Sequence, residues 1–422
     1  MRTVAFLLAA LLIALGGLHC SRSTEPGAPD QGSANPPDRT PQDLTPQEQS
    51  LLGSSNQFGF KLFQKVAEAS APGDNVFISP LSASYALGMC YNGAAGTTRE
   101  GMATALELSG LSVEEVNKAY HGLTELLTGL DSTVQMDIAN SIWYRLGFPV
   151  RQEFIDLNAT YFDALVREID FDAPWAADTI NHWVAENTHD KIKEIVTPFE
   201  IRSCVMALLD AIYFKGTWTI TFDTAATQPE TFYLADGSTV QRDLMASDTM
   251  YGYFENDLLQ AVEIPYGQES FAMVVLLPKT GHSPEDIIAQ VTADDWSAWM
   301  DGLEVDTVRL RLPKFKLSYE VGLNDMLKAM GIAEAFSPDA DFSNIVDGGG
   351  IFISQVKQKA FVQVDERGTE AAAVTVVLMP TAYPGGPKWM FVNRPFLFAI
   401  RERVSGTVIF IGKIADPVWR EE

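Results

Sequence analysis

Cysteine is scarce in this sequence, and its scarcity limits the chemistry that the chain can support. The 422 residues include 3 cysteines, Cys20, Cys90 and Cys204. None stands in a spacing typical of a zinc site, so we expect no metal and no other cofactor. A disulfide between Cys90 and Cys204 is open. A domain of this size needs no such crosslink, however, and two buried free thiols are the expected state.

Basic residues are also few. The sequence holds 30 Lys and Arg against 55 Asp and Glu, a formal net charge of −25. A broad nucleic-acid surface needs concentrated positive charge to displace counterions, so nucleic acid is not an expected partner. The remaining composition, with 46% hydrophobic and 20% charged residues, is that of an ordinary globular chain.

Long hydrophobic runs are absent except at the N-terminus. An apolar run from Val4 to Leu15 follows Arg2, which is the charged start and short core of a secretory signal rather than a full membrane span. The sequence Leu15-Gly-Gly-Leu-His-Cys20 then resembles a bacterial lipoprotein signal, in which the cysteine becomes the lipidated first residue. We therefore predict a signal peptide over residues 1–19 and lipidation of Cys20. A plain secretory signal, cut near residues 17–24, is the alternative.

The sequence behind the signal has almost no large apolar residue. Residues 20–50 are rich in Pro, Gly, Ser, Asp and Gln, which predicts a flexible tether. No similar linker and no internal repeat follows, so we expect one domain over residues 51–422.

Hydrophobic periodicity within this domain predicts helices first and strands mostly later. The expected helices are 57–69, 80–91, 113–130, 150–162 and 177–188. The expected strands are 207–214, 271–277, 308–312, 361–364, 396–401 and 407–411. Because helices and strands do not alternate regularly, the fold class is α+β with large mixed or antiparallel sheets.

A segment of small residues late in the domain is the most informative feature of the chain. Its small side chains recur at the strand period of two and can enter a packed sheet from one face: Thr369, Ala371, Ala373 and Thr375. Gly368 precedes them and supplies the backbone freedom of a hinge. Residues 376–387 are apolar and then rich in Pro and Gly, which suits a surface loop offered to a partner.

Catalytic signatures are missing. The sequence contains no G-x-S-x-G elbow, and its 5 histidines stand in no triad order. We therefore do not expect an enzyme.

Taken in order from Asn75 to the last strand, several segments resemble those of the serpin family of serine protease inhibitors. The matching segments are Asn75-Val-Phe-Ile-Ser-Pro-Leu-Ser82, Gly93-Ala-Ala-Gly-Thr-Thr98, Asp210-Ala-Ile-Tyr-Phe-Lys-Gly-Thr-Trp218, Glu263-Ile-Pro-Tyr266, Met273-Val-Val-Leu-Leu-Pro278, Leu312-Pro-Lys-Phe-Lys316, Phe391-Val-Asn-Arg-Pro-Phe-Leu-Phe398 and Phe410-Ile-Gly-Lys413. The order of so many pieces argues against coincidence. The resemblance implies the serpin fold, with a helical N-terminal portion and an exposed reactive loop.

The segment of small residues resembles the reactive-loop hinge of that family. The resemblance assigns the hinge and the inserting strand to Glu366, Gly368, Thr369, Glu370, Ala371, Ala372, Ala373 and Thr375. It implies a suicide-substrate inhibitor of serine endopeptidases, with cysteine endopeptidases as a further class. The protease attacks the loop and is trapped as the acyl-enzyme when the cleaved loop inserts into the large sheet. Glu370 lies in the opposite phase to the small residues and can stay solvated.

The family's usual spacing from the glutamate matched by Glu366 places the reactive bond between Ala382 and Tyr383. A small apolar residue before the bond suits elastase-like proteases with a small apolar pocket. Cleavage after Leu378 is also open, and would shorten the inserting strand.

The resemblance also implies a region where the sheet opens to admit the loop. Its residues are Ser79, Ser82, Asp210, Trp218 and Gln358. Asp210 stands where most of the family has asparagine, and Gln358 stands where a histidine is usual. Two outcomes are open. The Gln358 amide donates to the Asp210 carboxylate, or an ionised and poorly paired Asp210 destabilises the closed sheet.

Partners and location follow from the same resemblance. Some relatives bind polyanions through a basic helix, but the matching stretch 113–130 offers only Lys118 and His121 beside several acids, so no heparin-like activator is expected. We expect a monomer that touches a membrane only through its lipid anchor, at the outer membrane or cell surface, or else in the extracellular medium. A non-inhibitory serpin that acts as a binding protein or a plain protease substrate is the competing function.

Overall fold

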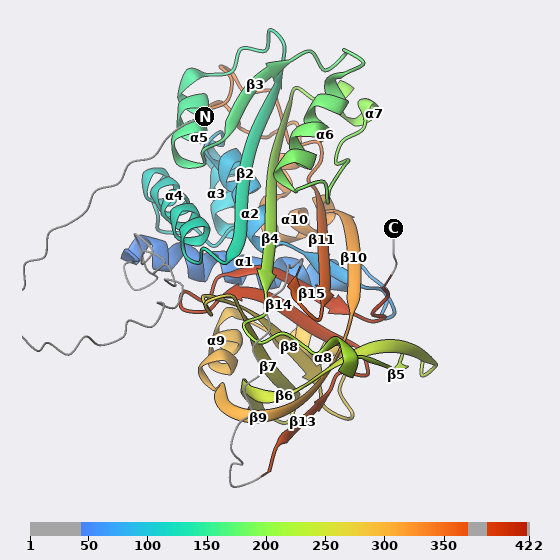
Figure 1. Cartoon of the computed structure of the whole chain (residues 1–422). Helices are drawn as coiled ribbons and strands as arrows, with labels where there is room; N and C mark the ends of the chain where they lie inside the picture. The colour runs from blue at the N-terminus through green and yellow to red at the C-terminus, as the bar shows by residue number, and fades with distance from the viewer. Residues whose placement is uncertain (1–43, 370–385, 420–422) are drawn as a thin grey trace, which may run out of the picture. The chain divides into compact units, whose positions relative to one another are not determined.

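Two β-sheets and the helices around them form the structure, a computed structural model in which residues 44–369 and 386–419 are described (Figure 1). These residues belong to one compact unit that spans Pro37–Glu422. Helices dominate the first part of the chain and strands the rest, which confirms the α+β prediction. Among the described residues, no helix combines the length and the apolar character needed to cross a bilayer.

Helix α1 (Pro46–Glu68) begins earlier than the sequence predicted. Thr45 caps it, because the Thr45 hydroxyl accepts from the Glu48 backbone N–H while the Glu48 carboxylate accepts from the Thr45 backbone N–H. Leu51 and Leu52 on the same helix are buried in the core. The last residues of the predicted 20–50 tether therefore belong to the folded domain, and the predicted domain start at Leu51 is too late.

The other predicted helices are confirmed, with ends that move by one or two residues, and further short ones accompany them. They are α2 (Pro80–Tyr91), α3 (Gly96–Ala105), α4 (Val113–Gly129), α5 (Gln152–Tyr161), α6 (Ala176–Asn187), α7 (Pro198–Arg202), α8 (Pro284–Gln290), α9 (Ala293–Asp301) and α10 (Asn324–Leu327). Short 3-10 turns span Thr224–Ala226 and Ala333–Phe336, and a π turn spans Lys328–Ile332.

Within residues 44–369 and 386–419, the larger sheet has nine strands. Its order is β1 (Val76–Ile78), β15 (Val408–Ile414), β14 (Phe396–Glu402), β8 (Phe271–Pro278), β7 (Leu259–Tyr266), β6 (Thr239–Glu255), β9 (Glu304–Pro313) and β13 (Lys388–Phe391), with β5 (Gln228–Tyr233) paired to β6. Most neighbours are antiparallel, whereas β13 runs parallel to β9.

The second sheet, which has six strands among the described residues, positions the candidate site. Its order is β10 (Phe315–Gly322), β11 (Lys357–Asp365), β12 (Gly368–Thr369), β4 (Met206–Thr217), β2 (Val134–Arg145) and β3 (Leu165–Ile169). Alternate residues of β4 face opposite sides. Ala207 and Leu209 pack with the small cluster around α6, whereas Leu208 and Ile212 pack against the main core.

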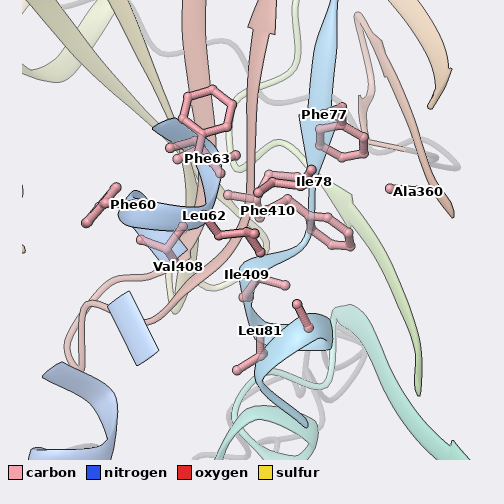
Figure 2. Packing of buried hydrophobic residues seen from close by; sticks show 14 of the residues in the cluster. Phe60, Leu62, Phe63, Phe77, Ile78, Leu81, Ala360, Val408, Ile409 and Phe410 are labelled. Carbon is pink, nitrogen blue, oxygen red and sulfur yellow. The ribbon is translucent and has the colours of Figure 1, made fainter. Parts of the chain in front are cut away.

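The main core lies between α1, α2 and the strands at the end of the larger sheet. Figure 2 shows Phe60, Leu62 and Phe63 of α1 close to Val408 and Ile409 of β15. Phe77 of β1 stacks on Phe398 and on Phe410, with ring centroids 5.5 and 5.4 Å apart. This core fixes the start of α2, and therefore places Ser79 and Ser82 beneath the second sheet.

Candidate functional site

The described part of the predicted hinge, Glu366–Thr369, lies at one end of the six-stranded sheet. Its two-residue strand β12 fits between β11 and β4. Thr369 pairs with Val364 of β11 on one side and with Gly216 of β4 on the other, and both pairings are antiparallel. The hinge therefore occupies the first two positions of a strand between β4 and β11.

Gly368 can occupy its place only because it lacks a side chain. Its φ of 150° is in a region that residues with a Cβ rarely adopt. A Cβ at Gly368 would also collide with the carbonyl oxygen of Gly216 and lie 2.8 Å from Thr217 Cα. Both facts support the assignment of Gly368 as the hinge glycine.

Glu366 anchors the start of the hinge. Lys314 Nζ lies 3.0 Å from Glu366 Oε2, and the Thr227 hydroxyl donates to Glu366 Oε1 at 2.8 Å. The Phe222 backbone N–H donates to the Glu366 carbonyl at 2.8 Å. Burial of Glu366 opposes its ionisation, but the bonds from Lys314 and Thr227 outweigh it, so the pKa of Glu366 lies below its usual value.

Trp218 and Tyr266 each form a hydrogen bond with the rest of the hinge. The Trp218 indole donates to the Asp365 carbonyl at 2.9 Å, and its ring stacks on Tyr266 with centroids 4.4 Å apart. The Tyr266 and Thr369 hydroxyl oxygens are 2.7 Å apart. Because Tyr266 is fully buried, the side chain of Thr369 points into the protein interior.

Beyond the hinge, β4 and β11 do not pair directly with one another in the described part of the chain. β4 pairs with β2 on its far side, and β11 pairs with β10 on its far side. In the described part of the chain, the facing edges meet no strand other than β12. We call this space, between Met206–Lys215 and Lys357–Gln363, the β4–β11 slot. Its far end widens into a cavity of about 330 Å³ lined by residues that include Leu208, Asp210 and Gln358.

Ser79, Ser82, Asp210 and Gln358 lie close together beside the slot, where they line one small cavity. Ser79 caps α2 by accepting from the Ser82 backbone N–H at 3.2 Å, and its own hydroxyl donates to the Ile409 carbonyl at 2.8 Å. Trp218 is not part of this group, since it lies eight positions beyond Asp210 in the sequence, about 26 Å along an extended chain. The predicted sheet-opening region is thus two separate places, the hinge end and the middle of the slot.

The first of the two open alternatives, a bond from Gln358 to Asp210, is wrong. Gln358 Nε2 instead donates to the Ser79 carbonyl at 2.7 Å, and Gln358 Oε1 accepts from the Ser79 N–H at 3.0 Å. The Ser82 hydroxyl reaches the backbone carbonyl of Asp210 at 3.5 Å. Ser79 is therefore the partner of Gln358, because its backbone groups at the start of α2 satisfy both ends of the amide.

Asp210 has a buried carboxyl group without a hydrogen-bond partner among the described residues. Its backbone borders the slot, but among the described residues neither carboxyl oxygen accepts or donates a hydrogen bond, and both are shielded from solvent. Burial raises the pKa of Asp210 well above its usual value, and the nearby Ser82 hydroxyl only partly opposes the shift. The facing residue on β2, Asn140, also has an unpaired buried side-chain oxygen. Burial without a hydrogen-bond partner therefore disfavours the ionised form of the Asp210 carboxyl.

Part of the predicted site falls outside the described residues. These positions are Cys20, Glu370, Ala371, Ala372, Ala373, Thr375, Leu378, Ala382 and Tyr383. Of the cysteines within the described residues, Cys90 is buried, Cys204 is half-buried, and both are free thiols. No cluster of three or more metal-ligating side chains occurs in the part of the chain that the structure covers.

Sequence reasoning missed several residues that hold the hinge. They are Gly216, Thr227, Tyr266 and Lys314. Tyr266 and Lys314 lie in segments that resemble the family, but their types alone suggested packing and surface charge. Their contacts with the hinge cross more than 50 residues of sequence, and no local pattern signals such contacts.

Comparisons with known proteins agree with this geometry. The family model described as serpin (serine protease inhibitor) matches residues 53–417. An uncharacterised serpin-like protein of Thermococcus kodakarensis is 33% identical, over 99% of each chain. Human neuroserpin is 32% identical over 83% of this chain and 88% of its own.

Solved structures show the same likeness. The crystal structure of tengpin, a thermophilic serpin in the native state, has a TM-score of 0.79 and 31% identity, covering 86% of this chain and 94% of its own. Native protease nexin-1, crystallised with heparin, also has a TM-score of 0.79, with 29% identity over 88% of this chain and 100% of its own. Because the family model matches residues 53–417 and the fold is that of solved serpin structures, the chain belongs to the serpin family of serine protease inhibitors.

Proposed function

We propose that this chain is a suicide-substrate inhibitor of serine endopeptidases, with cysteine endopeptidases as a further class. A protease cleaves the reactive loop, and the loop then inserts into the β4–β11 slot before the acyl-enzyme can hydrolyse. The supporting observation is the position of β12, which pairs antiparallel with both β4 and β11 directly beside the hinge end of that slot.

The register of β12 makes the proposal specific. Thr369 lies opposite Gly216 and Val364, and each further residue of an inserting strand would move one place along each wall. Thr375, six residues on, would then lie opposite Asp210 and Gln358. Its phase is that of Thr369, so its small hydroxyl side chain would face the buried carboxyl of Asp210. The segment and the slot thus fit each other in side-chain size and in polarity.

The energy for trapping would come from the unpaired edges of the slot. Each backbone hydrogen bond that a new central strand forms contributes a net of about 1 kcal/mol. A strand that pairs on both sides along Met206–Lys215 would gain on the order of ten kcal/mol. That gain is comparable to the whole stability of a typical domain, and is enough to move a tethered protease.

The direct test is incubation with a panel of serine and cysteine proteases, including pancreatic elastase. We expect a protease complex that survives hot detergent, and a rise in thermal stability after cleavage. Clean cleavage with neither result would instead favour the non-inhibitory alternative. Mass spectrometry of the released C-terminal peptide would locate the reactive bond, which we propose to be Ala382–Tyr383.

A pair of hinge variants tests the insertion step. Thr369→Arg places a charge in the phase that faces the interior and should convert the inhibitor into a substrate. Glu370→Arg is the matched control, because this position lies in the opposite phase and should leave trapping intact. Equal inhibition by both variants would refute insertion through the slot.

We also propose that the mature chain is an exported lipoprotein anchored through Cys20. The support is the sequence of the first twenty residues, followed by polar residues that would hold the inhibitor away from a membrane. Radiolabelled fatty acid should label the wild type, whereas Cys20→Ala should lose the label and leave the membrane fraction.

We further propose a monomer that needs no polyanion. On α4, Lys118 is paired with Glu114, and size exclusion with and without heparin tests both statements.

A further inference from the structure

A short turn follows α6 and lies across the hinge end of the β4–β11 slot. α6 packs on β2 and β4, and residues 188–192 leave its C-terminal end (Figure 1). Thr188, Lys191 and Ile192 of this turn line one small cavity together with residues of both slot walls and with Thr369. We call residues 188–192 the crossing turn.

The crossing turn contacts both walls of the slot at the same level. The ring centroids of His189 and of Tyr213 on β4 are 4.3 Å apart, and Lys191 Nζ lies 5.2 Å from the ring centroid of Phe361 on β11. A strand that continued the register of Thr369 would reach Tyr213 and Phe361 at its third place beyond Thr369. Its side chain there would take the opposite phase to Thr369 and lie on the face of the sheet that the turn covers. The crossing turn must therefore lift from at least one wall before an inserting strand can pass.

His189 joins the crossing turn to the sheet through a titratable contact. Its Nε2 lies 2.9 Å from Oδ2 of Asp137, the residue of β2 that pairs with Tyr213. Gln135 Nε2 lies 2.9 Å from the same ring nitrogen and donates to Asp137 Oδ2 at 2.9 Å. A neutral imidazole can accept from Gln135 at this nitrogen, whereas an imidazolium must donate, and its bond to a carboxylate is charge-assisted. Protonation of His189 therefore strengthens the contact between the turn and β2.

The backbone of the crossing turn fixes the place of His189. His189 and Asp190 have φ of 48° and 62°, in the left-handed region that residues other than glycine rarely adopt. The Asp190 N–H donates to the Ala185 carbonyl at 2.8 Å, and the buried Thr188 hydroxyl accepts from the Ile192 N–H at 3.1 Å. These bonds hold the turn in one conformation, which presents the His189 ring to β2 and β4.

The type of side chain sets the pH range in which this contact changes. A histidine ordinarily titrates near pH 6.5, and Asp, Glu, Tyr and Lys ordinarily titrate outside the range from pH 5.5 to 7.5. The charged and titratable groups around His189 all belong to those four types. They are Asp137 on β2, Tyr213 and Lys215 on β4, Lys359 on β11, and Glu186, Asp190, Lys191, Lys193 and Glu194 on the segment of the turn itself.

We propose that the crossing turn is a pH-sensitive closure of the slot, and that protonation of His189 slows insertion of the loop. This inference rests on the proposed function, because insertion through the slot is the step that the turn controls. The contribution of the His189–Asp137 pair is present at pH 5.5 and is lost as the pH rises to 7.5. Both side chains are half-exposed, at 45% and 43%, so the expected change in rate is that of a surface ion pair, about two- to fivefold.

The test measures entry into the slot without a protease. The probe is a fluorescent synthetic peptide with the sequence of residues 370–378, acetylated and amidated so that its termini carry no charge. All proteins in the test carry Asp210→Asn, because Asp210 also borders the slot and burial raises its pKa. We expect the peptide to enter this parent protein about two to five times more slowly at pH 5.5 than at pH 7.5.

Two variants ask whether the His189–Asp137 pair causes the difference. His189→Asn removes the titrating ring, and asparagine tolerates the left-handed backbone at this position. Asp137→Asn removes the carboxylate. Both variants should take up the peptide at the same rate at the two pH values. His182→Asn is the matched control, because His182 pairs with Glu186 on its own helix and its loss should leave the pH dependence intact.

Hydrogen exchange of the backbone amides of the turn is a second readout that does not depend on the peptide. After correction for the intrinsic effect of pH on exchange, residues 189–192 of the parent should be about two to five times better protected at pH 5.5 than at pH 7.5. The same amides of His189→Asn should be equally protected at both pH values.

The outcomes separate this proposal from the proposed function. The same pH dependence in the parent and in His189→Asn would overturn the proposal. A pH dependence that is lost in His189→Asn, in a protein that forms no detergent-stable complex with any protease, would support the crossing turn and refute the suicide mechanism. A peptide that enters none of the proteins at either pH would overturn insertion through the slot, and this proposal with it.

Discussion

Gln358 and Ser79 are joined by two hydrogen bonds, in which the Gln358 amide donates to the Ser79 carbonyl at 2.7 Å and accepts from the Ser79 N–H at 3.0 Å. This pairing ties β11 to the start of α2. It also uses both the donor and the acceptor of the Gln358 side-chain amide, the group that was expected to pair with Asp210. The buried carboxyl of Asp210 therefore receives no hydrogen bond from Gln358.

Asp210→Asn should stabilise the protein at neutral pH. The pKa of Asp210 in the folded state lies well above its usual value because the carboxyl is buried. Its favourable contribution is thus complete below the unfolded pKa of about 3.9, and is lost as the pH rises through the folded pKa. The asparagine variant cannot ionise and avoids this loss, which amounts to about 1.4 kcal/mol for each pH unit by which the folded pKa exceeds the unfolded one.

Thermal unfolding of both proteins between pH 4 and pH 8 measures this effect. The difference in melting temperature should be largest at high pH and shrink as the pH falls toward 4. Asp301→Asn, at the exposed end of α9, is the control and should give no such trend. A wild type and an Asp210→Asn variant with parallel curves would contradict a buried, neutral Asp210.

Gly368→Ala should disrupt the hinge. The new Cβ would meet the Gly216 carbonyl and the Thr217 backbone, and the φ of 150° would strain any residue other than glycine. We expect β12 to leave its place between β4 and β11, which removes the start of the inserting strand. The stoichiometry of inhibition should then rise several-fold, because more loops are cleaved before insertion traps the protease. A stoichiometry equal to that of the wild type would show that β12 need not form first.

Glu366→Gln should loosen the hinge in a pH-dependent way. The pKa of Glu366 is lowered, so its contribution to stability is present above the unfolded pKa of about 4.3 and is lost as the pH falls through the folded pKa. At pH 7 the variant should lose roughly 1–3 kcal/mol, the usual value of a hydrogen-bonded charge. The two proteins should converge only as the pH falls below the folded pKa of Glu366.

Calorimetry across that pH range checks the prediction, with Lys314→Met as the partner variant. Removal of both side chains should cost less than the sum of the two single changes, because they share one interaction. Fully additive losses would mean that the 3.0 Å contact contributes nothing.

Much of the fold was predictable because periodicity and caps are local signals. Strand β2 was missed, since Asp137, Asn140 and Ser141 interrupt its apolar pattern and its stability comes from pairing along β4. The start of α1 was also missed. Its Thr45-Pro-Gln-Glu48 capping sequence is polar, and its composition does not differ from that of the tether before it.

At the site, residue types indicated the correct region but not the correct partners. A bond between Asp210 and Gln358 is a reasonable expectation from sequence, because both residues are polar and lie near the slot. The backbone of Ser79 competes more successfully, since it presents a donor and an acceptor together at the N-terminus of α2. Such competition depends on backbone positions that are distant in sequence, and no spacing of side chains encodes it.

The last prediction concerns the segment between α6 and β4, which reaches across the slot to β11. Lys357 Nζ lies 2.9 Å from Glu200 Oε1, and Lys359 Nζ donates to the Glu194 carbonyl at 3.1 Å. The segment thus continues directly into β4, one wall of the slot. An ion pair and a hydrogen bond join it to β11, the other wall. Any strand that enters must separate these walls, so the contacts should slow entry.

Lys357→Met should therefore hasten spontaneous insertion of the uncleaved loop. A loss of about 1 kcal/mol from the barrier corresponds to a roughly fivefold shorter half-life of inhibitory activity at elevated temperature. Glu200→Gln should have a similar effect, and the double variant should be no faster than either alone. Lys328→Met removes a lysine that is paired at the surface with Asp325, and should leave the half-life unchanged. Equal half-lives for the wild type, both single variants and the double variant would mean that the slot opens without breaking the Lys357–Glu200 contact.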